Sequence, residues 1–199
     1  MKEFENYKKY KWFYTLSGKL VVGGKNSTQN DSLLKEIKSI RKEFIIMHTA
    51  DPGSPFSVIV SDVKKVSRKD IEEAAIFTAC FSQAWKSGKN KTLVHLFNSS
   101  QIYKSDEMKS GTWGVMGNVE KLLVNLSLVL TKQESVLRAV PEKSVKNNKD
   151  ILARIYPGRI PKEDIFPKLA IEIGDKFSQS EILSALPAGG LRFLANKTK

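Results

Sequence analysis

The chain has little of the chemistry that builds disulfides or metal sites. It contains one cysteine, Cys80, and two histidines, His48 and His95. One cysteine cannot form a disulfide within the chain, and these three residues lie too far apart in the sequence to suggest the converging ligands of a zinc site. Cys80 has apolar neighbours, which favour an inert buried thiol. We therefore expect no metal site and a reducing compartment.

Long apolar segments are also missing. The most apolar stretch, Leu122–Leu130, is interrupted by Asn125 and Ser127, and it is shorter than the roughly 20 residues that a membrane-spanning helix needs. Residues 1–7 contain no apolar segment of the kind found in signal peptides. These absences predict a cytoplasmic protein with no membrane partner.

Two sequence motifs that would indicate an enzyme are absent. The sequence contains neither G-x-x-x-x-G-K-S/T, the phosphate-binding loop of many nucleotide hydrolases, nor G-x-S-x-G, the nucleophile elbow of α/β hydrolases. We therefore predict no cofactor and favour a protein that binds its partner without catalysis.

Positive charge is what the chain has in excess. Lysine and arginine number 33 against 21 aspartate and glutamate residues, which gives a net charge of +12. Hydrophobic residues make up 41% of the chain, enough for a globular core. Such an imbalance indicates a negatively charged partner, with nucleic acid and anionic membranes as the usual ones. A basic solvated surface without a special purpose is the alternative.

The most informative segment is His48-Thr49-Ala50-Asp51-Pro52-Gly53-Ser54-Pro55, which lies between the apolar runs 45–47 and 56–60. Both runs are typical of buried strands, and the Pro-Gly and Ser-Pro pairs force a sharp turn. Polar side chains at such a turn indicate a site. His48 and Asp51 could act as an acid–base pair with Ser54 as nucleophile. Alternatively, Asp51 and Ser54 bond the backbone of the turn itself.

The hydrophobic pattern predicts an α/β or α+β fold with a mixed sheet and flanking helices. We expect an aromatic hairpin over 10–22, a helix after residue 25, and one largely buried helix from Asp70 to Trp85. Further strands are expected over 91–97, 112–116, 122–130 and 136–140, with a turn over 156–159. The predicted organisation is a core of residues 1–140 and a helical C-terminal extension of residues 141–199, where Ser178 begins a capping box.

Basic and polar side chains gather near the aromatic residues of the first half. Lysines neutralise phosphates, and amides bond phosphate, sugar or base edges. Gly23-Gly24-Lys25 before a helix could hold a phosphate on backbone N–H groups, although an ordinary strand-to-helix turn has the same pattern. The residues in question are Lys8, Lys9, Lys11, Lys25, Asn26, Gln29, Asn30 and Lys86.

Four of these segments, in this order, resemble the NFACT-R domain, the RNA-binding domain of the NFACT proteins of ribosome-associated quality control. The aromatic hairpin comes first. The other matching segments are Gly23-Gly24-Lys25-Asn26 with Gln29-Asn30, then His48–Pro55, then Glu73-Ala74-Ala75 with Ser82-Gln83-Ala84-Trp85-Lys86. Gly111–Gly117 matches a later family motif more loosely, and the resemblance covers about residues 8–130. Lys25 stands where the family often has arginine, which keeps the charge but loses a bidentate fork.

The resemblance implies a standalone NFACT-R protein that binds tRNA or ribosomal RNA. It also implies the large ribosomal subunit as a partner, and a chain without the other NFACT domains would not elongate tails alone. One small eukaryotic type of relative is associated with DNA, so DNA is an alternative ligand.

We predict that the nucleic acid lies on one basic face, with no catalytic and no metal-binding residue. Phosphates would contact Lys11, Lys25 and Lys86. The polar pocket would be lined by Asn26, Gln29, Asn30, His48, Asp51, Gly53 and Ser54. Two other classes of function stay open, namely a nuclease-like enzyme centred on His48, Asp51 and Ser54, and a ribosome-associated protein-interaction module whose charge is incidental.

Overall fold

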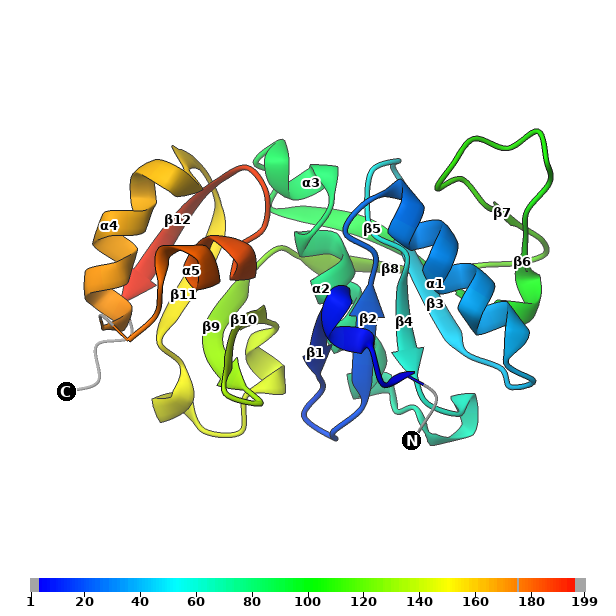
Figure 1. Ribbon diagram of the computed structural model, residues 1–199, viewed down its shortest axis with the longest axis horizontal. Coiled ribbons are helices and arrows are strands. Elements are labelled where there is room, and N and C mark those ends of the chain that lie inside the picture. Colours follow the sequence, from blue (N-terminus) through cyan, green and yellow to red (C-terminus); the bar gives the residue numbers. More distant parts are fainter. Residues whose placement is uncertain (1–3, 175, 196–199) are drawn as a thin grey trace.

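The computed structural model describes residues 4–174 and 176–195, and it confirms the α+β class. Two antiparallel sheets stand next to each other along the long axis of the molecule, and each has helices of its own (Figure 1). Among the described residues, every strand pairing is antiparallel, so the predicted mixed sheet does not combine parallel with antiparallel strands.

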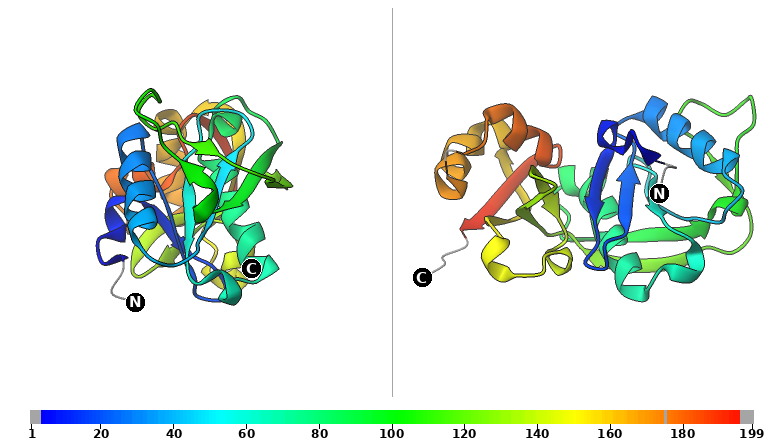
Figure 2. Two further views of the ribbon diagram at one scale, coloured as in Figure 1. Left: turned by 90° about the vertical axis from the view of Figure 1, so that its right-hand side faces the viewer. Right: turned by 60° about the horizontal axis from the view of Figure 1, so that its bottom comes forward.

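The larger sheet has six strands and is buried on both faces. Helix α1 (Ser27–Ser39) covers one face and helix α2 (Arg68–Cys80) covers the other, as Figure 2 shows. Strand residues alternate between the two helices, so Trp12 packs on the side of α1 and Phe13 on the side of α2. This double cover explains the continuous apolar runs. The strand order is β1 (Lys11–Tyr14), β2 (Leu20–Gly23), β4 (Ser57–Val60), β3 (Ile45–Thr49), β5 (Lys91–Asn98) and β8 (Glu120–Asn125).

The smaller sheet crosses the boundary that the sequence suggested at residue 140. Its order is β10 (Val136–Val140), β9 (Leu128–Gln133), β11 (Ala153–Pro161) and β12 (Gly190–Ala195). The C-terminal segment thus carries the expected helices, α4 (Lys162–Ile173) and α5 (Gln179–Ala185), together with two strands that the prediction of a helical extension omitted. Residues 156–159, expected to be a turn, lie inside β11, where the pairing register shifts after Pro157.

Two long elements of the prediction are each split in the structure. The expected helix from Asp70 to Trp85 is α2 followed by the short helix α3 (Gln83–Lys86). Ser82 separates them, because its hydroxyl donates to the Ala79 carbonyl and accepts from the Ala84 N–H. The expected strand 122–130 likewise divides into β8 and β9, which belong to different sheets. Short elements complete the fold: η2 (Tyr7–Lys9), η3 (Val63–Lys65), η4 (Ser99–Gln101), β6 (Ile102–Tyr103), β7 (Gly114–Val115), η5 (Glu142–Ser144) and η6 (Asn148–Asp150).

Side chains from the smaller sheet bond the edge strand of the larger one. The Gln133 amide accepts from the Tyr14 N–H at 2.8 Å and donates to the Tyr14 carbonyl at 2.8 Å. The Arg138 guanidinium donates twice to the Trp12 carbonyl, at 3.1 Å each. The backbone of β1 is therefore satisfied on this side by side chains and not by a further strand.

A buried carboxylate ties the β1–β2 turn to the start of α2. Asp70 is 1% exposed, and its oxygens accept from the Thr15 and Ser17 hydroxyls at 2.6 Å and from the Ser67 N–H at 2.9 Å. Burial by itself would raise the pKa of Asp70, but the bonds from Ser17, Thr15 and Ser67 outweigh it and lower the pKa to about 2. The ionised form therefore stabilises the fold.

We predict that Asp70→Ala lowers the free energy of unfolding by roughly 2–4 kcal/mol, because it leaves the buried Thr15 hydroxyl and the capping N–H of Ser67 without their acceptor. Urea unfolding at pH 7 measures this, with Asp106→Ala at an exposed position as the control. The folded pKa of Asp70 lies below the ordinary value of 3.8, so its contribution is complete above that value and is lost as the pH falls towards 2. A difference between the two variants that does not shrink on acidification would contradict this role.

Candidate functional site

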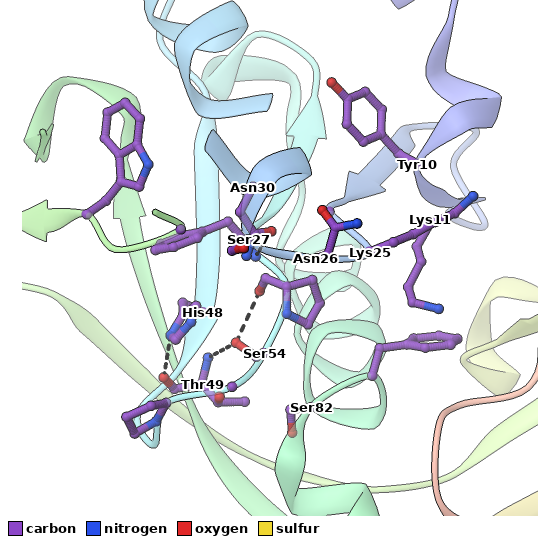
Figure 3. A pocket seen from close by; sticks show the side chains of 18 of the residues that line it. Tyr10, Lys11, Lys25, Asn26, Ser27, Asn30, His48, Thr49, Ser54 and Ser82 are labelled. Atoms are coloured by element: carbon purple, nitrogen blue, oxygen red, sulfur yellow. Dashed lines mark hydrogen bonds between the residues drawn. The ribbon is translucent and has the colours of Figure 1, made fainter. Parts of the chain in front are cut away.

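A cleft of about 900 Å³ opens where the N-terminus of α1, the turn after β3, helix α3 and strand β10 meet. Figure 3 shows its side chains from close by. The structure brings eight of the predicted site residues together along its walls and leaves out Gln29 and Asp51. The eight are Lys11, Lys25, Asn26, Asn30, His48, Gly53, Ser54 and Lys86.

Lys11 and Lys25 stand at one end of the cleft beside Arg138. Lys11 has its ammonium 4.2 Å from the centre of the Phe81 ring. Burial, together with the positive charges of Arg138, Lys25 and Lys162, lowers the pKa of Lys11 to about 8. Burial and the charge of Arg138 also lower the pKa of Lys25. These shifts show that the cations raise one another's energy.

No carboxylate offsets this charge within the part of the chain that the structure describes. Neither aspartate nor glutamate lines the cleft, and Lys11, Lys25 and Arg138 form none of the ion pairs seen there. Lys8, at the rim, pairs with Glu134 at 3.2 Å and is largely exposed. The inner cations are therefore left to be neutralised by a ligand.

Arg138 is a residue of this site that the sequence analysis missed. It comes from β10, more than a hundred positions after Lys11 and Lys25, and its guanidinium lies 4.3 Å from the centre of the Trp12 ring. Burial lowers its pKa to about 10. The only sequence signal is an arginine inside the otherwise apolar run 136–140, and nothing in the sequence says that this run meets β1.

The N-terminus of α1 forms the floor between the cations and the turn. The Asn26 side chain caps the helix by accepting from the Gln29 N–H at 2.9 Å. Gln29 in turn accepts from the Lys25 N–H at 3.0 Å, so its amide holds the loop and does not face the cleft. The first turn of α1 has no acidic residue, which leaves the positive end of the helix dipole uncompensated.

Asn30 and Ser54 hold the walls in place. Asn30 is buried, and its Oδ1 accepts from the Phe56 N–H at 3.1 Å. A Cβ on Gly24 would lie 2.2 Å from that oxygen, which explains the glycine. The Ser54 hydroxyl accepts from the Thr49 N–H at 3.0 Å and donates to the Pro55 carbonyl at 3.1 Å. The turn therefore uses these polar groups for its own backbone.

Gly53 anchors the turn to α3. Its φ is +94°, a conformation that favours glycine, and its carbonyl accepts from the Gln83 N–H at 2.9 Å. A Cβ at this position would lie 2.5 Å from Cγ of Gln83. Lys86, at the end of the same short helix, is exposed, so α3 presents a cation at the mouth of the cleft.

The three residues considered for catalysis do not bond one another. Nδ1 of His48 lies 2.7 Å from the Thr49 carbonyl, whereas the Asp51 carboxylate is exposed and pairs with Lys89 at 3.1 Å. Ser54 is engaged by the turn backbone. The acid–base–nucleophile arrangement is thus not assembled in this structure.

A second group of residues that the sequence analysis did not select lines the end of the cleft beyond His48. It includes His95, the cross-strand partner of His48, and Trp113. The carboxylate of Asp31 holds the loop before β7, because it accepts from the Trp113 indole at 2.8 Å, from Lys104 at 3.2 Å and from the Gly111 N–H at 2.9 Å. Strand register and this loop anchor are long-range facts, which a single sequence does not reveal.

Two general properties bear on the class of site. Among the described residues, no group of three His, Cys, Asp or Glu side chains is placed to hold a metal ion. No helix there has the length and apolar character needed to cross a bilayer. Burial raises the pKa of the Cys80 thiol, as expected for a core residue.

Comparisons with known proteins point to RNA. The model of the NFACT protein RNA binding domain matches residues 9–117, which is more than half of the chain. The chain is 27% identical over 95% of its length to the archaeal Rqc2 homolog aRqcH of Methanocaldococcus jannaschii. It is 24% identical over 72% of its length to the ribosome quality control complex subunit NEMF homolog of Drosophila melanogaster. It spans only 29% and 15% of the lengths of these two relatives.

A solved structure shares the fold. The C-terminal part of the fibronectin/fibrinogen-binding protein from Streptococcus suis matches with a TM-score of 0.52 at 24% identity, over 59% of this chain and 45% of that one. At this identity the likeness concerns the fold alone.

We predict that Lys11→Met raises the free energy of unfolding at pH 7 by on the order of 1 kcal/mol, because it removes a partly buried cation that other cations repel. The folded pKa of about 8 lies below the ordinary 10.5, so the unfolded state binds more protons between these values and the wild type gains stability as the pH rises. The advantage of the variant should therefore shrink from pH 8 to pH 10.

Urea unfolding across this pH range makes the measurement. The matched control is Lys91→Met, because Lys91 also begins a strand but is exposed. A less stable Lys11→Met protein, or a stability difference that does not change with pH, would contradict the lowered pKa of Lys11 and the cost of its charge in the folded state.

Proposed function

The chain belongs to the family of NFACT protein RNA-binding domains, and we propose that it binds tRNA or ribosomal RNA through the cleft. The observation that carries this proposal is a group of three cations, the partly buried Lys11 and Arg138 and the exposed Lys25, with no carboxylate along the described walls. Because these charges have no counter-charge in the free protein, an anion that neutralises them binds favourably. RNA presents phosphates at regular intervals.

The floor of the cleft supports the same ligand. The N-terminus of α1 has no acidic residue in its first turn and presents the positive end of the helix dipole. Lys86 adds a cation on the opposite side of the opening. Phosphates entering from solvent would therefore meet positive potential on three sides, and the exposed lysines of the surface would steer the RNA towards it.

We further propose a role in ribosome-associated quality control, in the cytoplasm and with the large ribosomal subunit as partner. The support comes from the two relatives, one described as an Rqc2 homolog and the other as a ribosome quality control complex subunit homolog. Because the chain corresponds to a small share of each relative, the proposal concerns the RNA contact and not the whole activity of those proteins.

The proposed role is binding, and not catalysis. His48, Asp51 and Ser54 are the side chains with the chemistry for hydrolysis, and each has its hydrogen bonds directed elsewhere. The same geometry suits a rigid recognition surface, because the hydrogen bonds of His48 and Ser54 hold the turn and do not involve the cations of the cleft.

The experiment compares two triple variants with the same change in net charge. The first is Lys11→Gln, Lys25→Gln, Lys86→Gln. The second is Lys64→Gln, Lys65→Gln, Lys69→Gln, whose positions are exposed and follow the other end of β4. Binding to labelled tRNA, to an unstructured RNA of equal length and to duplex DNA is measured across a salt series, and the same samples are scored for cleavage.

We expect the cleft variant to weaken tRNA binding at least about tenfold near 0.1 M salt and to reduce the magnitude of the salt slope by about one for each lost phosphate contact. The control variant should change both much less. Equal losses in the two variants would assign the binding to general charge. Preferred binding of duplex DNA, or cleavage that disappears in Asp51→Asn, would replace the proposal with the DNA or the nuclease alternative.

A further inference from the structure

We propose that the cleft receives one unpaired nucleotide of the bound RNA, with its phosphate among the cations and its base against His48. This inference rests on the proposed function and goes one step beyond it, because it names the form of RNA that the cleft takes. It is carried by the two chemically different ends of the cleft, by its volume and by the burial of the side chains that line it.

The two ends are separated by the start of α1. Figure 3 shows Lys11 and Lys25 on one side and His48 on the other, with Asn26, Ser27 and Asn30 between them. The cation end suits a phosphate. The other end is lined mostly by uncharged side chains, most of which are planar rings: His48, His95, Phe56, Phe97 and Trp113, together with Val115. A nucleotide has the same division between a charged and a flat heterocyclic part.

His48 is prepared for contact with a heterocycle. Its ring centre lies 4.5 Å from that of Phe56, with 35° between the planes, so one face is supported by a buried aromatic residue. Burial lowers the pKa of His48 more than the hydrogen bond to Thr49 raises it, and the nearby His95 adds to the lowering, which favours the neutral ring. Because a carbonyl can only accept, Nδ1 carries the proton and donates to Thr49. Nε2 is then an acceptor, suited to an amino or imino group of a base.

The size of the cleft and the burial of its lining side chains suit an unpaired nucleotide. A volume of about 900 Å³ lies within the range of roughly 300–1,000 Å³ typical of small-molecule sites. His48 is only partly exposed and Asn30 is buried, so a group must enter the cleft to contact them. A paired base in an A-form helix stays within its stack, whereas bases in bulges, loops and ends can be turned out and bound singly.

The walls are fixed before any ligand arrives. Asn30 and Ser54 bond the backbone on either side of the turn, and Asp31 fastens the loop that carries Trp113. A preformed site loses little conformational entropy on binding, so the energy of stacking one base is available to discriminate between ligands.

The experiment uses the full chain and three RNA hairpins that share one sequence. One hairpin is fully paired in its stem, the second has a single bulged nucleotide, and the third has an abasic residue at the bulge. All three are closed by the same non-nucleotide linker, so that the bulge is the only unpaired nucleotide, and they have nearly the same number of phosphates. Affinities are measured for the wild type, for His48→Ala and for His48→Phe, which keeps an aromatic ring but loses the acceptor, with thermal unfolding as a check on folding.

We expect the wild type to bind the bulged hairpin at least about fivefold more tightly than the paired one, and the abasic hairpin to lose most of that difference. His48→Ala should remove the preference, so that it binds the bulged hairpin no more tightly than the paired one. His48→Phe, expected to fold if His48→Ala does not, should retain part of the preference through stacking.

The possible failures are distinguishable. Equal affinity for the bulged and paired hairpins would overturn this inference and leave the proposed RNA binding intact. A preference that survives both His48 variants unchanged would also overturn it, since the base would then lie elsewhere. No binding to any of the hairpins, or to tRNA, at low salt would overturn the proposed function itself.

Discussion

The contact between Arg138 and the Trp12 carbonyl is the interaction on which the rest of the site depends. It satisfies the backbone of the edge strand β1 and joins the smaller sheet to the larger one. The same guanidinium brings a third cation to Lys11 and Lys25. A residue that serves the fold by bonding a carbonyl thus also makes the cleft more positive. The placement of the two sheets and the electrostatics of the cleft therefore depend on the same residue.

The cleft is held in a form that costs stability. Like charges with lowered pKa values are unfavourable in the free protein. The hydrogen bonds of Asn30, Ser54 and Asp31 hold the backbone around the cleft in place, so the cleft stays open. Buried carboxylates do appear in this fold, but they are placed away from the cleft. Asp70 and Glu73 bond the β1–β2 turn at the opposite end of β1. This segregation of acidic from basic groups is typical of a surface that is neutralised by its ligand.

Much of the local structure could be predicted from the sequence, because short-range rules decide it. The aromatic hairpin, the helix after Asn26 and the capping box at Ser178 follow from alternation, capping chemistry and turn residues. What could not be predicted depends on contacts between distant segments. At the break of the buried helix, the local hydrogen bonds of the Ser82 hydroxyl are joined by a distant one from the Gln83 N–H to the Gly53 carbonyl. The two strands of the C-terminal segment join the sheet because β11 pairs with the distant strand β9 and β12 in turn pairs with β11.

The candidate site divides in the same way. Its residues near the turn and at the start of α1 were found from local composition, and the structure gathers most of them, whereas Gln29 and Asp51 serve the loop and the surface. We expect the cations of the cleft to lack a counter-charge until RNA supplies one. The decisive measurement is the pKa of the Lys11 ammonium by NMR, without and with bound tRNA. We predict a value of about 8 in the free protein and a higher value in the complex. An ordinary value near 10.5 in the free protein, unchanged by tRNA, would contradict it.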